Sequence, residues 1–284
     1  MQSNIDQRVL KYTLLTDSFS DLTAVVNEAT SANSASVSML PGDYLYVSAF
    51  LPFNHKFFKL TAGEEADPGA VPLIELLNAP TEWTAVVDQI DYTGGFSSSG
   101  VLQWTPNWDS NWGLVSQSNR DVPALQNGPV VYQAYWLRIS FPDPIAFGMD
   151  YVGQKFSSDA DLYAEYPMLN QTAILSGWKV GKADWEDQHI LAATYIAKEL
   201  IQRNLAVSKD QILDISTLRS AAVHKTAHII YSGLGVKNYA ENIAAALKAF
   251  ELAMKQDKFG LDVNGNARKD REEVTMKTTS RASR

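Results

Sequence analysis

The sequence predicts an α+β protein of two domains, an antiparallel β-sandwich followed by an α-helical bundle with an extended C-terminal tail. In the first half, short runs rich in Val, Tyr, Trp and Phe alternate with clusters of Gly, Pro, Asn, Asp and Ser, as strands and turns do. From Trp185 onward, apolar residues recur at helical spacing instead. With 284 residues, the chain is long enough for two domains that each bury a core.

Six strands are expected in the first half. The clearest is 132–141, where one face is wholly apolar and the other is mixed, as in a half-buried strand. Turn signals such as Pro41-Gly42-Asp43 recur between the runs and favour antiparallel pairing over parallel strands with crossover helices. A short helix is expected at 21–29. The six expected strands are 9–15, 44–50, 57–60, 83–90, 100–104 and 132–141.

The domain boundary is placed in the stretch FPDPIAFGMDYVG, which contains two prolines and two glycines and after which the alternation by twos ends. This gives domains 1–146 and 147–284. Three amphipathic helices of about twenty residues should pack as an antiparallel bundle. A short fourth helix at 159–166 should end at Pro167. The three apolar stripes are Ile190, Ala193, Ala197, Leu200, Ile201 and Leu205; Ile215, Leu218, Ala222 and Ile229; and Val236, Tyr239, Ile243, Leu247, Phe250 and Met254.

Composition excludes several classes of function. The chain has no cysteine, so thiol nucleophiles, thiolate metal sites and disulfides are excluded, and a reducing compartment is favoured. The net charge is −8, and residues 1–150 carry 6 basic against 16 acidic side chains, so a duplex nucleic-acid footprint is not expected. Neither a signal peptide nor a membrane-spanning helix is expected, because no sufficiently long apolar run occurs.

Two motifs have the spacing of metal sites, but another reading is favoured for each. His224 and His228 are four residues apart, yet Lys225 stands where a general base would follow, so surface or interface histidines are favoured over zinc. Oxygen-bearing residues follow a calcium-loop pattern, but Ala267 replaces the glycine of the sharp turn, so an Asx-rich turn is favoured. No cofactor is therefore expected. The calcium-loop residues considered are Asp262, Asn264, Asn266, Arg268, Asp270 and Glu273.

No catalytic residues are expected, and the protein is predicted not to be an enzyme. The acidic pairs, such as Glu64-Glu65, are typical of surface loops. No phosphate-binding GxxxxGK[ST], dinucleotide-binding GxGxxG or nucleophile-elbow GxSxG motif occurs. Five of the seven tryptophans lie in the first half, and they favour a core or protein-interface role over stacking on sugar rings. These five are Trp83, Trp104, Trp108, Trp112 and Trp136.

Several segments resemble virion proteins of tailed bacteriophages. GDYLYVSAFLPFNHKFFKL (42–60), the Glu82-Trp83 pair, VDQIDYTGGFSSSGVLQW (87–104) and YWLRISF (135–141) resemble a β domain of such proteins. SDADLYAEYPML (158–169), the helix starting WEDQHILAATYIAKEL at Trp185, the paired helices after it, and FGLDVNGNARKDREE (259–273) resemble head-to-tail connector proteins, also called adaptor, head-completion or neck proteins.

The resemblance implies a structural virion protein that forms a homo-oligomeric ring of roughly twelve copies beneath the portal and joins capsid to tail. Its implied partners are the portal protein, tail or neck proteins and further copies of itself. Genomic DNA would pass through the channel without sequence-specific binding, and no membrane is involved. Assembly in the host cytoplasm and a final location in the virion neck are expected.

Interface residues are expected in three places. Two are the tryptophan loop, WTPNWDSNW at 104–112, and the alanine-rich helix at 240–253, and the third is the polar tail at about 259–284, which would become ordered on binding. The alternative function is a carbohydrate-binding or tail/baseplate structural protein with a helical oligomerisation domain, and a hydrolase using the acidic loops ranks last. The expected interface residues are Trp104, Trp108, Trp112, Ala245, Ala249, Val274, Met276, Arg281 and Arg284.

Overall fold

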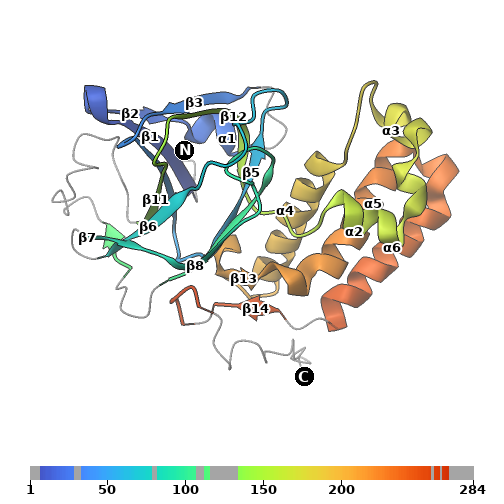
Figure 1. Ribbon diagram of the computed structural model, residues 1–284. Coiled ribbons are helices and arrows are strands. Elements are labelled where there is room, and N and C mark those ends of the chain that lie inside the picture. Colours follow the sequence, from blue (N-terminus) through green and yellow to red (C-terminus); the bar gives the residue numbers. More distant parts are fainter. Residues whose placement is uncertain are drawn as a thin grey trace. The chain divides into compact units, whose positions relative to one another are not determined.

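The computed structural model describes residues 7–28, 33–78, 82–106, 112–115, 134–256, 259–262 and 264–268. The chain divides into two compact units (Figure 1). The first comprises Met1–Gly153 with Asn264–Arg268, and the second comprises Gln154–Val263 with Lys269–Arg284. Strands make up the first unit and helices most of the second, so the predicted fold class is confirmed.

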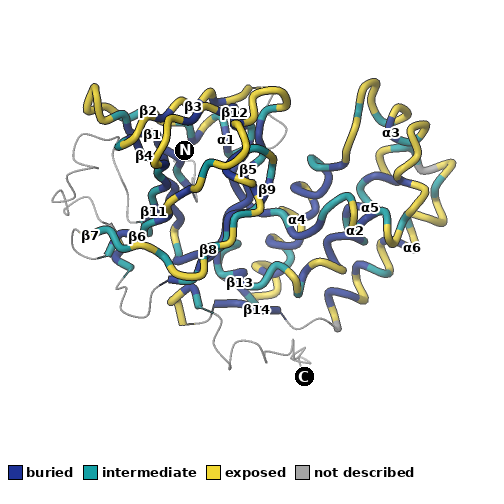
Figure 2. The backbone as a smooth tube through the Cα atoms, viewed as in Figure 1, coloured by how far each residue is buried: buried dark blue, intermediate teal, exposed yellow. Residues whose placement is uncertain are grey.

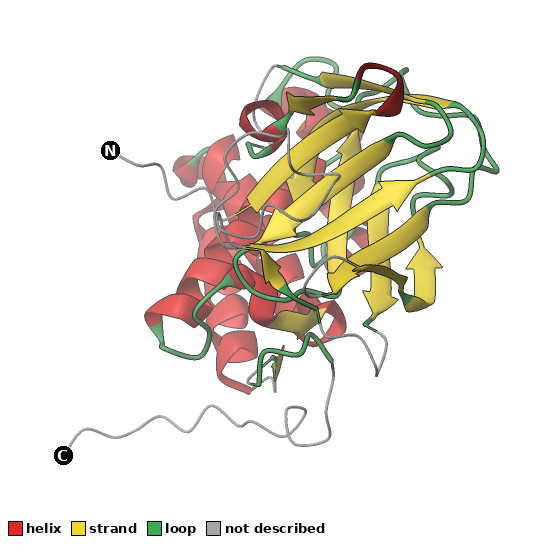
Figure 3. Ribbon diagram, turned by 90° about the vertical axis from the view of Figure 1, so that its left-hand side faces the viewer, coloured by secondary structure: helices red, strands yellow, loops and turns green. Residues whose placement is uncertain are grey.

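Two antiparallel sheets form the first unit (Figure 3). One has the strand order β2-β1-β4-β11-β6-β7, with β10 paired to β11, and the other has the order β3-β12-β5-β9-β8. The strands of the first sheet are β1 (Gln7–Thr13), β2 (Ser18–Asp21), β4 (Tyr44–Ala49), β6 (Leu73–Asn78), β7 (Glu82–Ala85), β10 (Leu114–Val115) and β11 (Ala134–Ser140). Those of the second are β3 (Ala35–Met39), β5 (His55–Leu60), β8 (Val87–Asp91), β9 (Gly100–Thr105) and β12 (Ile145–Gly153).

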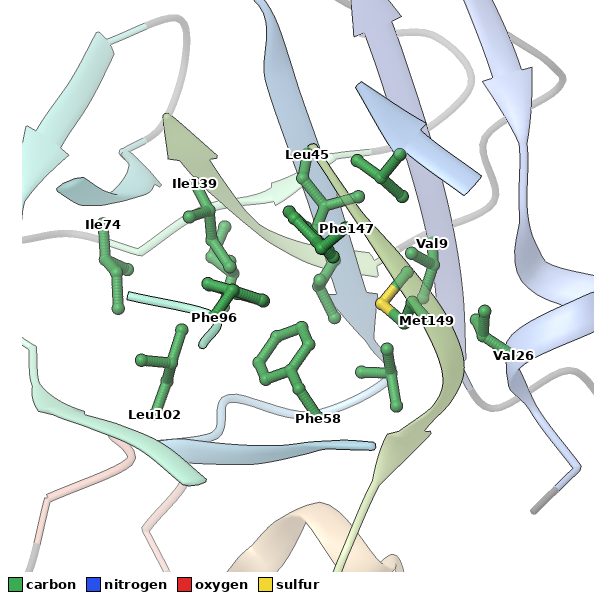
Figure 4. Packing of buried hydrophobic residues seen from close by; sticks show 14 of the residues in the cluster. Val9, Val26, Leu45, Phe58, Ile74, Phe96, Leu102, Ile139, Phe147 and Met149 are labelled. Atoms are coloured by element: carbon green, nitrogen blue, oxygen red, sulfur yellow. The ribbon is translucent and has the colours of Figure 1, made fainter. Parts of the chain in front are cut away.

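One hydrophobic core lies between the two sheets (Figure 4). Leu45 and Ile139 point into it from the first sheet, and Phe58, Leu102 and Met149 from the second. Alternate residues of a strand point to opposite faces, so the same strands also present a second face away from this core. The sandwich thus rests on the period-2 pattern from which it was predicted.

The expected boundary at residue 146 differs from the division that the structure shows. Strand β12 continues to Gly153 and pairs with both β3 and β5, so it is an interior strand of the second sheet. Pro142 and Pro144 lie in the tight turn between β11 and β12 rather than in an interdomain linker. Prolines occur both in tight turns within a sheet and in interdomain linkers. Only the strands with which β12 pairs show that this stretch is a turn.

Other β elements differ in detail from expectation. The single strand expected at 83–90 is two strands, β7 and β8, which belong to different sheets. Asp88 has a φ of 49°, so the backbone is irregular at the start of β8. The expected short helix is observed as α1 (Thr23–Val26).

The second unit is built from α2 (Asp159–Glu165), α3 (Thr172–Trp178), α4 (Glu186–Gln202), α5 (Arg219–Leu234) and α6 (Val236–Gln256). Its 3-10 turns are η3 (Pro167–Asn170), η4 (Lys209–Gln211) and η5 (Ile215–Leu218), and η1 (Leu14–Thr16) belongs to the first unit. Short strands β13 (Ile212–Asp214) and β14 (Gly260–Leu261) pair in an antiparallel fashion. The three long helices match the three predicted stripes, whereas α3 was not expected.

Local sequence explains the ends of these helices. Ser158 and Asp161 form a capping box at the start of α2, which ends just before Pro167, as predicted. Gly235, with a φ of 116°, ends α5 in a conformation that other residues avoid. Helix α6 is kinked at Tyr239, where φ and ψ leave the helical region. No helix in the described ranges has the length and apolarity needed to cross a bilayer.

Candidate interaction surface of the helical unit

A buried histidine joins the start of the helical unit to three of its helices. His189 of α4 lies with its Nδ1 2.7 Å from Ser157 Oγ and 3.3 Å from Thr226 Oγ1 of α5. Its Nε2 lies 3.0 Å from Asp159 Oδ1 of α2. These contacts fix the mutual positions of α2, α4 and α5.

Asp159 is held as a carboxylate by this network. Burial alone would raise the pKa of Asp159, but the hydrogen bond and charge of His189 and the backbone N–H of Trp185 outweigh it and lower the pKa. Both Asp159 oxygens lie 3.2 Å from the Trp185 nitrogen. The carboxylate therefore acts as an anchor for the beginning of α4.

Serine, histidine and aspartate are the residue types of a hydrolase triad, but here they are structural. His189 is only 1% exposed and Ser157 only 6%, so a substrate carbonyl has no access to the hydroxyl. The imidazole also contacts serine through Nδ1 and the carboxylate through Nε2, the reverse of the usual arrangement. We interpret the cluster as a packing device.

The outer face of α4 carries large apolar side chains in contact with solvent. Leu191 is 40% exposed, Tyr195 48% and Ile201 38%. The exposed Thr194, Lys198 and Gln202 lie on the same face of the helix. We call this set, Leu191, Thr194, Tyr195, Lys198, Ile201 and Gln202, the α4 stripe. Ile201 was expected in the apolar stripe of this helix that packs inward, which is wrong because the inward face of α4 is centred on Ile196 and Leu200.

Lys225 of α5 extends the α4 stripe. Its Nζ lies 4.6 Å from the centre of the Tyr195 ring and 5.1 Å from that of Phe250 on α6. Desolvation lowers the pKa of Lys225, and the Glu199 carboxylate raises it in part. The ammonium group over the ring holds Tyr195 in place while leaving half of that side chain exposed.

A cavity of about 360 Å³ lies between α2 and the first turns of α5. Asp161 and Glu165 of α2 form one wall, and Arg219 and His224 of α5 contribute to the other. Ala164 and Val223 add apolar surface. We call this site the α2–α5 pocket. His224 Nδ1 is 2.8 Å from the Tyr166 hydroxyl, which fixes the imidazole at the edge of the pocket.

The tryptophans expected at an interface have different positions. Trp104 is 1% exposed and packs edge-on against Phe53, so it belongs to the sandwich core and the expected interface role is wrong for it. Trp112 is half-buried, and its indole N–H donates to the Trp136 carbonyl at 3.0 Å. Trp108 lies outside the described residues.

The other expected interface residues lie on α6 and in the tail. Ala245 is exposed and Ala249 is half-buried, so the alanine-rich helix does present part of its surface to solvent, as Figure 2 shows along α6. Lys248 and Glu251 of α6 are also exposed, so this face is mixed in character. The tail residues Val274, Met276, Arg281 and Arg284 lie outside the described residues.

The two motifs with metal-site spacing do not form metal clusters in the described ranges, where no group of three His, Cys, Asp or Glu side chains converges. Burial and the nearby Lys225 charge lower the pKa of His228. In the loop 264–268, the Asn264 and Asn266 side chains accept backbone hydrogen bonds from two residues onward, which is Asx-turn chemistry. Ala267 has a φ of 55°. Asp270 and Glu273 lie outside the described residues.

Sequence reasoning missed an aromatic cluster on the second face of the first sheet. The Arg138 guanidinium lies between the Tyr44 and Trp83 rings, at 4.3 and 4.6 Å from their centres. It also pairs with Glu75 at 2.6 Å. The alternation of residues along the strands could have revealed this cluster. Tyr44, Arg138 and Glu75 each alternate with the core residues of their strands and so point to the opposite face of the sheet.

Neither a protein-family model nor a curated protein matches this sequence.

Proposed function

We propose that this chain is a structural virion protein of a tailed phage, a head-to-tail adaptor or neck component that forms a ring beneath the portal. The observation that carries the proposal is the α4 stripe, since large apolar side chains exposed along a helix mark a protein interface. A subunit whose own core is complete gains no stability from such a surface until it binds a partner.

The position of the resembling segments supports the same proposal. Segment 42–60 spans β4 and β5, one strand from each sheet, and 135–141 covers most of β11. Segment 158–169 spans α2, and the segment from Trp185 begins α4. These segments of the resemblance thus fall on elements that build each unit, whereas segment 87–104 also includes the loop between β8 and β9.

Electron microscopy of the purified chain, alone and mixed with a portal protein of the same phage, tests the proposal. A ring, or added density below the portal, is the expected result. A Leu191→Ser/Tyr195→Ser variant, which removes two exposed apolar side chains without entering the core, is the comparison, and it should not form the ring or the added density. Portal particles that stay unchanged in the presence of excess wild-type chain would contradict the proposal.

Saccharide binding is a second candidate function, favoured by the half-buried Tyr44 and Trp83 rings around Arg138. The solvent-exposed parts of these half-buried rings, beside an arginine and a carboxylate, suit apolar contact with a sugar ring and hydrogen bonds to its hydroxyls. A polysaccharide array tests it with wild type, Trp83→Ala and the matched control Trp112→Ala. Saturable binding lost only in Trp83→Ala would favour this function.

A further inference from the structure

We infer that the α2–α5 pocket of one copy of this chain receives the α4 stripe of a second copy, so that the helical unit carries both halves of a head-to-tail contact. The inference rests on the proposed ring function and names the surfaces that would close the ring. The partner is therefore a second copy of this chain, in an arrangement that repeats in one direction around the ring.

The chemistry of the pocket matches that of the stripe. Ala164 and Val223 give the pocket an apolar part, and Asp161 and Glu165 give it two carboxylates against the single guanidinium of Arg219. Asp161 and Arg219 lie 3.8 Å apart and partly neutralise each other. Glu165 is exposed and has no ion pair within the described residues, so it is available for a cation from outside.

The stripe offers the complementary groups within two helical turns. Tyr195 and Leu191 supply apolar surface, and the exposed Lys198 supplies a positive charge that has no ion pair in the part of the chain described. The cavity volume of about 360 Å³ suits one or two side chains rather than a whole helix. We expect Tyr195 to enter the apolar part of the pocket and Lys198 to meet Glu165.

The two surfaces lie on opposite flanks of α5. Val223 lines the pocket, and Lys225 contacts the Tyr195 ring of the stripe. Two residues along an α-helix correspond to a rotation of about 200°, so these side chains leave α5 in nearly opposite directions. Figure 1 shows α2 and α4 as separate neighbours of α5 in the helical unit. A heterologous contact needs this placement, because each copy must bind one neighbour with each flank.

The absence of cysteine from the sequence allows a direct test. An Ala164→Cys/Thr194→Cys variant places one thiol at the pocket and one in the stripe, while Tyr195, Lys198 and Glu165, the side chains expected to meet, are kept. Treated with a short bismaleimide, it should give a ladder of dimers, trimers and larger species. The Ala164→Cys/Glu251→Cys control places the second thiol on the exposed face of α6. A ladder no stronger than this control, at concentrations up to millimolar, would overturn the inference.

Charge exchange in the same cysteine background makes the test more specific. Glu165→Lys and Lys198→Glu should each weaken association about tenfold, and the two changes together on one chain should restore the ladder. In an equimolar mixture of the two single variants, both contacts between unlike chains pair opposite charges, so alternating copies should also restore the ladder. Circular dichroism confirms that each variant is folded, and equal ladders from all variants would overturn the pairing of Glu165 with Lys198.

The outcomes separate this inference from the proposed function. If the chain adds density below a portal but gives no ladder above the control, the ring uses other surfaces and only the inference fails. If the ladder forms as expected but no portal binding occurs, the contact stands and the proposed virion function fails.

Discussion

Replacing Asp159 by asparagine should destabilise the helical unit while leaving the β unit intact. The carboxylate contacts His189 Nε2 at 3.0 Å, the Trp185 N–H at 3.2 Å and the Tyr163 hydroxyl at 3.3 Å. Asparagine keeps one oxygen acceptor, loses the negative charge, and places an NH2 group against a donor. The local order of α2 and the start of α4 should therefore decrease.

The expected cost follows from the hydrogen bonds that the charge strengthens. A hydrogen bond to a charged group contributes about 1.5–3 kcal/mol, and one such contribution is lost here, so we expect the free energy of unfolding to fall by about 2 kcal/mol. For a unit of this size, that corresponds to a decrease in Tm of about 6–12 °C. Glu251→Gln on the exposed face of α6 is the control, which removes the same charge and should change stability by less than about 0.5 kcal/mol.

The pH dependence gives a second measure of the same interaction. Because the pKa of Asp159 is lowered in the folded state, its stabilisation is fully present above the unfolded pKa of about 4 and is lost as the pH falls through the folded value. The difference in Tm between wild type and Asp159→Asn should be constant near neutral pH and shrink in acid. Calorimetry at several pH values measures it. Equal stabilities at pH 7 would refute the anchoring role of the carboxylate.

Three further outcomes are expected. Gly95→Ala should lower the free energy of unfolding by about 3 kcal/mol in urea titrations, because the new Cβ would lie 2.1 Å from the Ala70 carbonyl oxygen at a φ of 74°. The control Gly63→Ala, also at positive φ but in open space, should lower the free energy of unfolding by only about 1 kcal/mol. Trp185→Phe should cost about 2 kcal/mol by the same assay, since it removes the indole N–H bond to the Leu169 carbonyl. Adding calcium should leave the Tm unchanged, and a rise would revive the calcium-loop interpretation.

Hydrophobic periodicity predicted the elements whose apolar residues repeat at one spacing. Helix α4 was located from buried residues such as Ala193, and strand β11 from its wholly apolar core face, which includes Leu137, although Trp136 on its other face is buried as well. Strand β3 was missed because its buried positions include only Ala35, Val37 and Met39 between serines. Strand β12 was missed because its flanking prolines also fit a linker, and only pairing with β3 and β5 makes it a strand.

The candidate interaction surface was less accessible to sequence reasoning than the fold. A helical stripe shows which residues share a face, and α4 has apolar residues on both faces, so periodicity alone could not show that Leu191 and Tyr195 are exposed. That depends on which side of α4 meets α5, and the buried His189 settles this by facing Thr226. The α2–α5 pocket likewise combines residues more than fifty positions apart, brought together by packing between α2 and α5. An exposed apolar stripe and an acid-lined pocket on opposite flanks of one helix therefore come from tertiary packing, and they are properties that a repeating assembly would use.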